Sequence, residues 1–124
     1  MKELAGQTIL VTGASGGIGA AIVEQLASES AKVVIQYGRD EDAARRLHDR
    51  INGAGWILQA DLSDPSGSTD LWKRATLVAG RIHSLVNNAG IRTEISIDAD
   101  LDQWQAAWKR EFQVDFLQLS ICAE

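Results

Sequence analysis

Residues 8–19, "TILVTGASGGIG", carry the strongest structural signal in this chain. The first four residues are apolar and rich in β-branched side chains, a composition typical of a buried strand. Glycines at 13, 16, 17 and 19 follow, and a helical pattern then opens around Gly17. In that pattern Ile18, Ile22 and Leu26 are four residues apart and predict a single apolar stripe. We therefore expect a strand, a glycine-rich turn and a helix.

Strand and helix patterns alternate along the rest of the chain. Short apolar runs predict strands at 32–38, 56–61 and 83–90. Helical patterns run from Asp40 to the stop signal Asn52-Gly53, through Leu71, Ala75 and Val78, and from Leu101 to the end. Strands separated by such helices pair in parallel through right-handed crossovers, with helices on both faces of the sheet. The sequence predicts one α/β domain over residues 1–124, with a doubly wound parallel sheet.

The composition disfavours several classes of protein. The net charge is −5 and Lys and Arg form no marked cluster, which argues against a nucleic-acid partner. No segment is apolar over the length of a membrane span, and "MKELAGQT" lacks the apolar core of a signal peptide, so we expect a cytoplasmic protein. The one cysteine, Cys122, reads as a small packing residue. We expect His48 to be solvated and His83 to lie at the amino end of a strand. Neither histidine has a set of potential metal ligands around it, so no metal site is predicted.

The glycine-rich turn has the composition that an anion site needs. Gly13 would let the strand turn sharply, Gly16 and Gly17 would let a diphosphate approach the backbone, and Gly19 would let the helix pack close to the sheet. The helix amino terminus adds free N–H groups and a partial positive charge. No Gly-Lys-Ser/Thr is present, which disfavours a nucleoside-triphosphate loop. A tight turn without a ligand remains the alternative.

Three motifs, "TGASGGIG" at 12–19, "AD-L" at 60–62 and "NNAG" at 87–90, resemble those of classical short-chain dehydrogenases/reductases. The resemblance covers the chain from near residue 6 to residue 124 and implies a Rossmann-like fold that binds NAD(P). It implies that Asp61 and Leu62 lie beside the adenine, and that the turn after the fourth strand contacts the ribose side. The implied cofactor residues are Gly13, Ser15, Gly16, Gly17, Ile18, Gly19, Asp61, Leu62, Asn88, Ala89 and Gly90. On its own, Asp61 could equally cap the following helix.

The end of the second predicted strand bears on the choice of cofactor. An acidic residue there selects NAD, whereas a nearby basic residue accommodates the 2′-phosphate of NADP. Tyr37 occupies the position of the acid, Arg39 follows two residues later, and Asp40 reads as the start of the next helix. We therefore expect Tyr37 and Arg39 at the adenosine end and favour NADP(H), with NAD(H) possible. The alternative for Arg39 is a solvated loop residue.

The family's catalytic Tyr-x-x-x-Lys is absent from these residues. The one tyrosine, Tyr37, is followed four positions later by Glu41. By the resemblance, aligning Trp108 puts Asp115 at the position of the family's catalytic asparagine. An aspartate there could accept a hydrogen bond from water but could not donate one. A tolerated exchange without catalytic meaning is the alternative. The chain ends inside a helical pattern at Glu124, and we expect the catalytic serine, tyrosine and lysine beyond it.

Two functions from different classes follow. The first is an NADP-dependent oxidoreductase that transfers a hydride between NADPH and a small carbonyl or alcohol substrate, with this chain as its cofactor-binding half. The alternative is a non-catalytic dinucleotide-binding or dimerisation module. The last helical pattern is apolar on two faces, one through Leu101, Trp104 and Trp108 and another through Val114 and Leu117. Because only one face can pack on the sheet, we expect a homo-oligomer formed through this helix.

Overall fold

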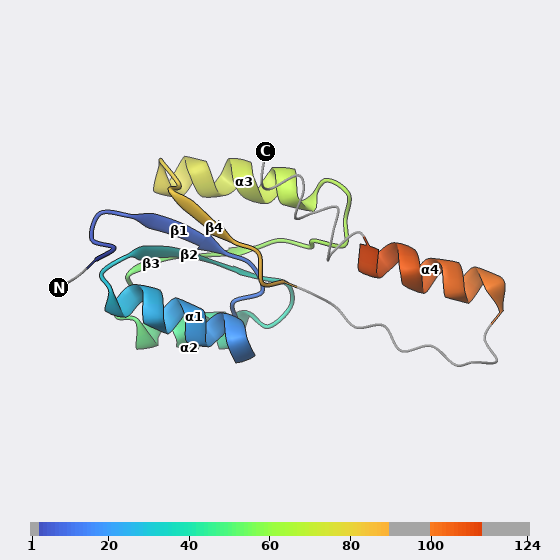
Figure 1. Cartoon of the computed structure of the whole chain (residues 1–124), viewed down its shortest axis with the longest axis horizontal. Coiled ribbons are helices and arrows are strands. Elements are labelled where there is room, and N and C mark those ends of the chain that lie inside the picture. The colour runs from blue at the N-terminus through green and yellow to red at the C-terminus, as the bar shows by residue number, and fades with distance from the viewer. Residues whose placement is uncertain (1–2, 90–99, 113–124) are drawn as a thin grey trace.

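The computed structural model describes residues 3–89 and 100–112, which alternate between strands and helices. Figure 1 shows the elements along the chain. They are β1 (Thr8–Val11), α1 (Gly17–Ser28), β2 (Lys32–Tyr37), α2 (Glu41–Arg50), β3 (Gly55–Gln59), α3 (Gly67–Ala79), β4 (Ser84–Val86) and α4 (Leu101–Phe112). The predicted order of four strand–helix pairs is confirmed.

The four strands form one parallel sheet in the order β3-β2-β1-β4. β1 therefore lies inside the sheet, between β2 and β4, although β4 is the last strand in the sequence. A sheet with this order places the turn after β1 next to the turn after β4. The doubly wound α/β fold is confirmed.

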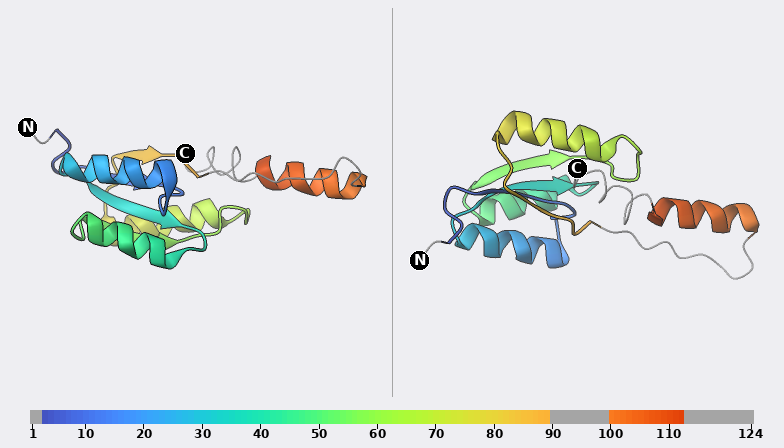
Figure 2. Two further views of the ribbon diagram at one scale, coloured as in Figure 1. Left: turned by 90° about the horizontal axis from the view of Figure 1, so that it is seen from below. Right: turned by 45° about the horizontal axis from the view of Figure 1, so that its top comes forward.

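The sheet separates two apolar cores. Ile9 and Val11 of β1 point to the face that α1 and α2 cover, whereas Leu10 points to the face that α3 covers. This alternation is the two-residue period of a strand with both faces buried. Figures 1 and 2 show α1 and α2 on one face and α3 on the other.

The prediction of a single apolar stripe on α1 is wrong at its first residue. Ile18 is 75% exposed, whereas Ala20 and Val23 are buried and Ile22 and Leu26 are partly buried. Ile18 lies in the first turn of α1, and it belongs to neither of the two apolar cores. An exposed isoleucine at this place leaves apolar surface for another contact.

The ends of α2 follow the expected chemistry. Asp40 precedes the helix and its Oδ1 accepts a hydrogen bond from the Ala43 N–H at 2.9 Å, so it is an N-cap. Asn52 and Gly53 both have positive φ, as a helix stop signal requires. The prediction that His48 is solvated is wrong, because its Nε2 lies 2.9 Å from the Gly55 carbonyl oxygen. This contact joins α2 to the start of β3.

α4 lies to one side of the body formed by the sheet and the first three helices (Figure 1). Leu101, at its start, is 70% exposed. Gly90, Asp115 and Cys122 lie outside the described residues, as does the chain after Phe112. Among the helices that the structure describes, none combines the length and the apolar character that a membrane span requires.

Candidate functional site

The glycine-rich turn lies at the carboxyl end of β1, between the ends of β2 and β4. Its backbone is held from both sides. The Gly13 N–H donates to Gln36 Oε1 at 2.7 Å, and the Ala14 N–H donates to the Gln36 carbonyl at 3.0 Å. On the other side, the Thr12 N–H donates to the Val86 carbonyl at 3.1 Å. The turn is therefore a fixed part of the sheet edge.

Thr12 links this turn to the segment after β4. Its hydroxyl accepts hydrogen bonds from the N–H groups of Asn88 at 3.1 Å and Ala89 at 3.0 Å, and donates to the Val86 carbonyl at 3.4 Å. The Asn88 side chain completes the link, because its Nδ2 donates to the Gly13 carbonyl at 3.0 Å. The first and third sequence motifs thus form one connected structure.

The glycines of the turn serve two different needs. A Cβ on Gly13, whose φ is +62°, would lie 2.8 Å from the Ala89 Cα, and one on Gly19 would collide with the Gly13 carbonyl oxygen. These two glycines allow the backbone and the helix to approach. A Cβ on Gly16 would have no described heavy atom within 4 Å, and its φ of −162° suits any residue. The fold itself does not require glycine at position 16.

Residues 16–18 are exposed, and Ser15 is half-buried. No side chain caps the start of α1, and its first turn contains no acidic residue. The amino terminus of α1 therefore presents its N–H groups and partial positive charge without a competing carboxylate from that turn. The described residues fit the pyrophosphate of a dinucleotide: an open helix end, a glycine where a Cβ would stand in free space, and the exposed Ile18 beside them.

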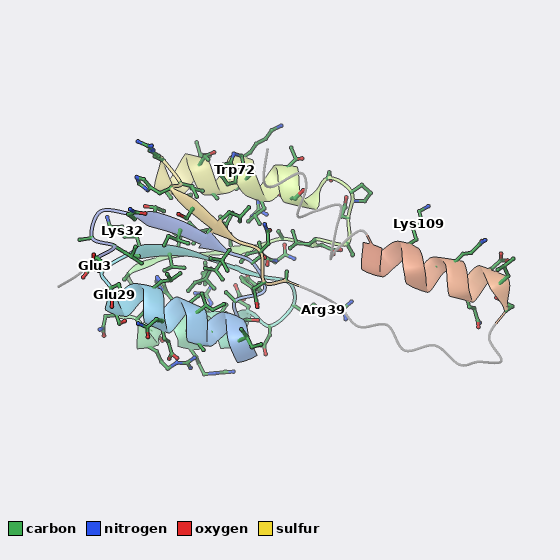
Figure 3. All side chains as sticks on the ribbon, viewed as in Figure 1. Glu3, Glu29, Lys32, Arg39, Trp72 and Lys109 are labelled. Carbon is green, nitrogen blue, oxygen red and sulfur yellow. The ribbon has the colours of Figure 1, made fainter. Side chains whose placement is uncertain are left out.

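Tyr37 and Arg39 differ in what they present at the end of β2. Tyr37 is 8% exposed, and its hydroxyl donates to Glu41 Oε1 at 3.2 Å. Burial, followed by the neighbouring Glu41 carboxylate, raises the pKa of the Tyr37 phenol above its ordinary value of 10.0. Arg39 is exposed, and Figure 3 shows it beyond the end of the sheet opposite to Lys32. Within the described part of the chain, its guanidinium makes no hydrogen bond or ion pair.

Asp61 and Leu62 follow β3 at the same edge of the sheet. Leu62 is buried in the core under α3, so it packs beneath the edge of the sheet and exposes little surface there. Asp61 is exposed, and its Oδ1 accepts from the N–H of Ser63 at 2.9 Å and from its hydroxyl at 2.5 Å. The N-cap of α3 is Ser66, so Asp61 does not cap that helix.

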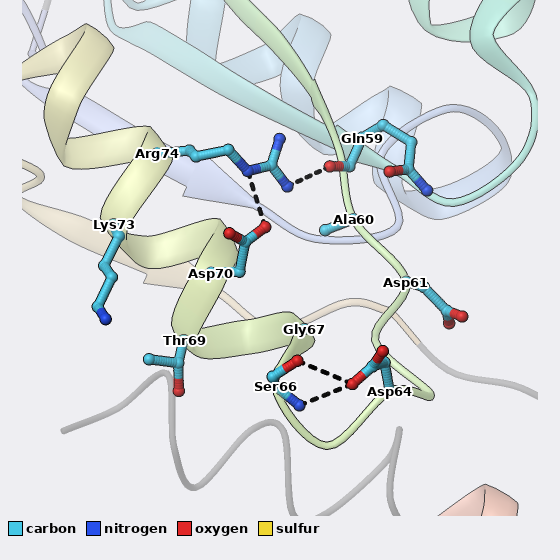
Figure 4. A pocket seen from close by; sticks show the side chains of 10 residues that line it. All are labelled: Gln59, Ala60, Asp61, Asp64, Ser66, Gly67, Thr69, Asp70, Lys73 and Arg74. Carbon is cyan, nitrogen blue, oxygen red and sulfur yellow. Dashed lines mark hydrogen bonds and ion pairs between the residues drawn. The ribbon is translucent and has the colours of Figure 1, made fainter.

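A cavity of about 330 Å³ opens between the end of β3 and the start of α3. Figure 4 shows Asp61 at its side and Arg74 reaching across from α3. Arg74 donates through Nε to Asp70 Oδ2 at 2.8 Å and through Nη2 to the Gln59 carbonyl. Because the guanidinium is engaged by these two acceptors, the lining of the cavity holds no uncommitted arginine.

Sequence reasoning missed Gln36. Gln36 is 2% exposed, lies inside β2, and its side chain contacts the glycine-rich turn directly. The only indication of its role in the sequence was that a polar residue interrupts the apolar run "VVIQY". His83, by contrast, lies at the amino end of β4 as predicted, where its Nδ1 accepts from the Thr8 N–H at 3.0 Å. Among the described residues, no three His, Cys, Asp or Glu side chains gather in a metal-binding arrangement.

Known proteins match the chain over nearly its whole length. A family model described as short chain dehydrogenase matches residues 7–123. A short-chain type dehydrogenase/reductase from Picea abies is 34% identical over 97% of this chain and 47% of its own length. The structure of a short chain dehydrogenase from Burkholderia cenocepacia J2315 in complex with NADP has a TM-score of 0.86 at 32% identity, covering 97% of this chain and 49% of that one.

A second solved structure gives the same result. FolM alternative dihydrofolate reductase 1 from Brucella canis, complexed with NADP, has a TM-score of 0.84 at 36% identity, over 97% of this chain and 48% of that one. The chain spans about half the length of these relatives.

Proposed function

The chain belongs to the short-chain dehydrogenase/reductase family, and from that premise we propose that it forms the NADP-binding half of an oxidoreductase. When bound, the nicotinamide cofactor supplies or accepts the hydride in such an enzyme. The observation that carries the proposal is the open amino terminus of α1 next to Gly16. Position 16 is a glycine although no described atom lies close enough to exclude a side chain there. The relatives are named as dehydrogenases and reductases, which favours the enzyme over the non-catalytic module.

The roles of the described residues follow from their positions. The main-chain N–H groups at the start of α1 would bind the pyrophosphate, and Gly16 would let it approach. Ile18 would offer apolar surface to the cofactor, and Ser15 a hydroxyl. Asp61 would accept a hydrogen bond from the adenine amino group. Asn88 and Ala89 would hold the ribose side close to the sheet, with Gly90 next in the motif.

We assign the preference for NADP to Arg39. Its exposed guanidinium has no described partner to neutralise it. Neither Tyr37, which ends β2, nor the following Gly38 carries a carboxylate that could bind a ribose 2′-hydroxyl. Both solved structures described above are complexes with NADP. A guanidinium can hold a phosphate through two parallel hydrogen bonds.

The experiment that tests this function is a measurement of dissociation constants for NADPH and NADH by fluorescence. Arg39→Asp should weaken NADPH binding about tenfold or more relative to NADH, the equivalent of about 1.4 kcal/mol for the lost phosphate contact. Arg81→Asp, the same charge change at an exposed residue before β4, is the control and should change neither affinity more than about twofold. Equal losses for both cofactors in Arg39→Asp would contradict the NADP assignment.

The remaining parts of the proposal concern the whole enzyme. The substrate would be a small carbonyl or alcohol compound, with the tyrosine and lysine of the family supplied from outside these residues. Asp115 would stand at the family's asparagine position. We also propose that the protein is cytoplasmic. We propose in addition that it forms a homo-oligomer through its last helix, because that helix has more apolar residues than one packed face can bury.

A further inference from the structure

We propose that Gln36 is a positioning residue for cofactor binding: its buried side-chain amide sets the position of the glycine-rich turn relative to the end of β3. This inference rests on the function proposed above. Gln36 would act without touching the cofactor, through the two backbone segments between which the dinucleotide lies.

The geometry of Gln36 is that of a bridge. Its Oε1 accepts from the Gly13 N–H at 2.7 Å, and its Nε2 donates to the Ala60 carbonyl at 2.8 Å. Its own carbonyl accepts from the Ala14 N–H at 3.0 Å. One residue thus holds two consecutive N–H groups of the turn and one carbonyl beyond β3. Because β2 lies between β1 and β3, a side chain on β2 is well placed to reach both.

The bridge stands where the regular ladders stop. The pairing of β1 with β2 ends at Val11 and Ile35, and the pairing of β2 with β3 ends at Tyr37 and Gln59. Beyond these pairs the chain leaves the sheet, so the Gly13 N–H and the Ala60 carbonyl have lost their strand partners. The amide of Gln36 replaces both partners with a single side chain.

The bridge is linked to the residues proposed to bind the cofactor on both sides. Gly13 precedes the open start of α1, and its carbonyl is held by Asn88. Ala60 precedes Asp61, the residue proposed for the adenine. A shift of Gly13 or Ala60 would therefore move the pyrophosphate site against the adenine site. Binding would weaken because pyrophosphate and adenine belong to one covalently linked ligand that must satisfy both sites at once.

The chemistry at position 36 needs both an acceptor and a donor. A carboxylate keeps the acceptor for Gly13 and loses the donor for Ala60, whereas a methionine of similar shape loses both. A protonated carboxyl group regains the donor. These three states allow the two hydrogen bonds to be removed and returned separately.

The test compares Gln36→Met and Gln36→Glu with the unchanged chain, and uses Gln25→Met as the control. Gln25 is an exposed glutamine near the carboxyl end of α1, and the glycine-rich turn lies at the other end of that helix. Dissociation constants for NADPH and NADH are measured where circular dichroism shows each variant to be folded, and urea unfolding gives its stability separately. Gln36→Met should weaken the binding of NADPH and of NADH by the same factor, about tenfold or more, because pyrophosphate and adenine are common to both cofactors. Gln25→Met should change neither affinity more than about twofold.

Gln36→Glu supplies the readout that a merely structural role would not produce. Its affinity, measured on folded protein, should rise as the pH falls and the carboxyl group gains its proton, more steeply than that of the unchanged chain. Folded Gln36 variants that bind both cofactors as tightly as the unchanged chain would overturn the inference and leave the proposed function standing. An unchanged chain that binds neither cofactor would overturn the proposed function first.

Discussion

At the scale of single residues, the glycines of the turn divide according to what excludes a side chain. At Gly13 and Gly19 the protein itself fills the space where a Cβ would lie. At Gly16 that space is open and the backbone conformation suits any residue. A glycine that the fold does not need indicates a ligand that comes close.

The first residue-scale prediction uses this difference. Gly16→Ala should leave the free energy of unfolding within about 0.5 kcal/mol, since no strain arises and the unfolded chain loses freedom. The same change should weaken dinucleotide binding about tenfold or more, because the methyl group would stand where the pyrophosphate approaches. Urea unfolding and fluorescence titration measure the two effects.

Gly13→Ala is the contrasting variant. It combines a positive φ with a contact of 2.8 Å to the Ala89 backbone, so it should lose about 1–3 kcal/mol of stability. Gly16→Ala protein that binds the cofactor like the unchanged chain would rule out this turn as the pyrophosphate site.

The second residue-scale prediction concerns Tyr37 and pH. Its phenol has a raised pKa in the folded state, first because of burial and then because of Glu41, so the folded chain holds the phenolic proton more tightly than the unfolded chain. The stability from this group is fully present below pH 10.0, the ordinary value, and is lost as the pH rises through the folded value. Tyr37→Phe should remove that part of the alkaline loss.

The measurement is the free energy of unfolding in urea from pH 8 to about pH 11, with the difference between the two proteins followed across the series. Subtracting the two curves cancels the lysines and arginines that titrate in both. A difference that stays constant across the alkaline range would contradict the assigned environment of Tyr37.

At the scale of elements, the link between β1 and β4 rests on Thr12. β4 has only three residues, and its ladder with β1 covers three residue pairs. The Thr12 hydroxyl adds to this link beyond the ladder by accepting the N–H groups of Asn88 and Ala89. The threonine of the first motif is therefore a structural residue that orders the third motif.

Thr12→Val tests this link, because it keeps the shape of the side chain and removes the hydroxyl. Two part-buried N–H groups lose their acceptor, and the loss of stability should be about 1–3 kcal/mol. Thr12→Ser keeps the hydroxyl and should stay closer to the unchanged chain. Urea unfolding of the three proteins decides the matter; equal stabilities for Val and Ser would show that packing, not hydrogen bonding, explains the threonine.

At the scale of the whole molecule, topology gathers the site. The order β3-β2-β1-β4 brings the ends of all four strands to one edge, with the first motif in the middle and the other two on either side. Within the described residues, the outer edge of β4 has no strand beside it. A further strand or another chain could pair there, as sheets with an open edge permit.

Local patterns in the sequence were sufficient for the elements, the helix stops and the glycine-rich turn. Apolar periodicity and glycine chemistry act over a few residues, so they can be read without knowing the fold. They predicted the α/β class, the start of a helix at Asp40 and the placement of the three motifs. The predictions failed for Ile18, which is exposed, and for His48, which contacts the Gly55 carbonyl. Both outcomes depend on how segments pack together, and the residues next to Ile18 and His48 in the sequence do not indicate that packing.

The tertiary structure alone revealed which groups hold the site together. Gln36 contacts Ala60 from 24 residues away, and the Ala89 N–H reaches Thr12 from 77 residues away. These pairs depend on the order of strands in the sheet. A single polar residue in a strand does not indicate which residues of other segments it will contact. Hence the turn and its likeness to a family could be read from the residues, whereas the bonds that fix the turn in place follow from parallel packing of distant segments.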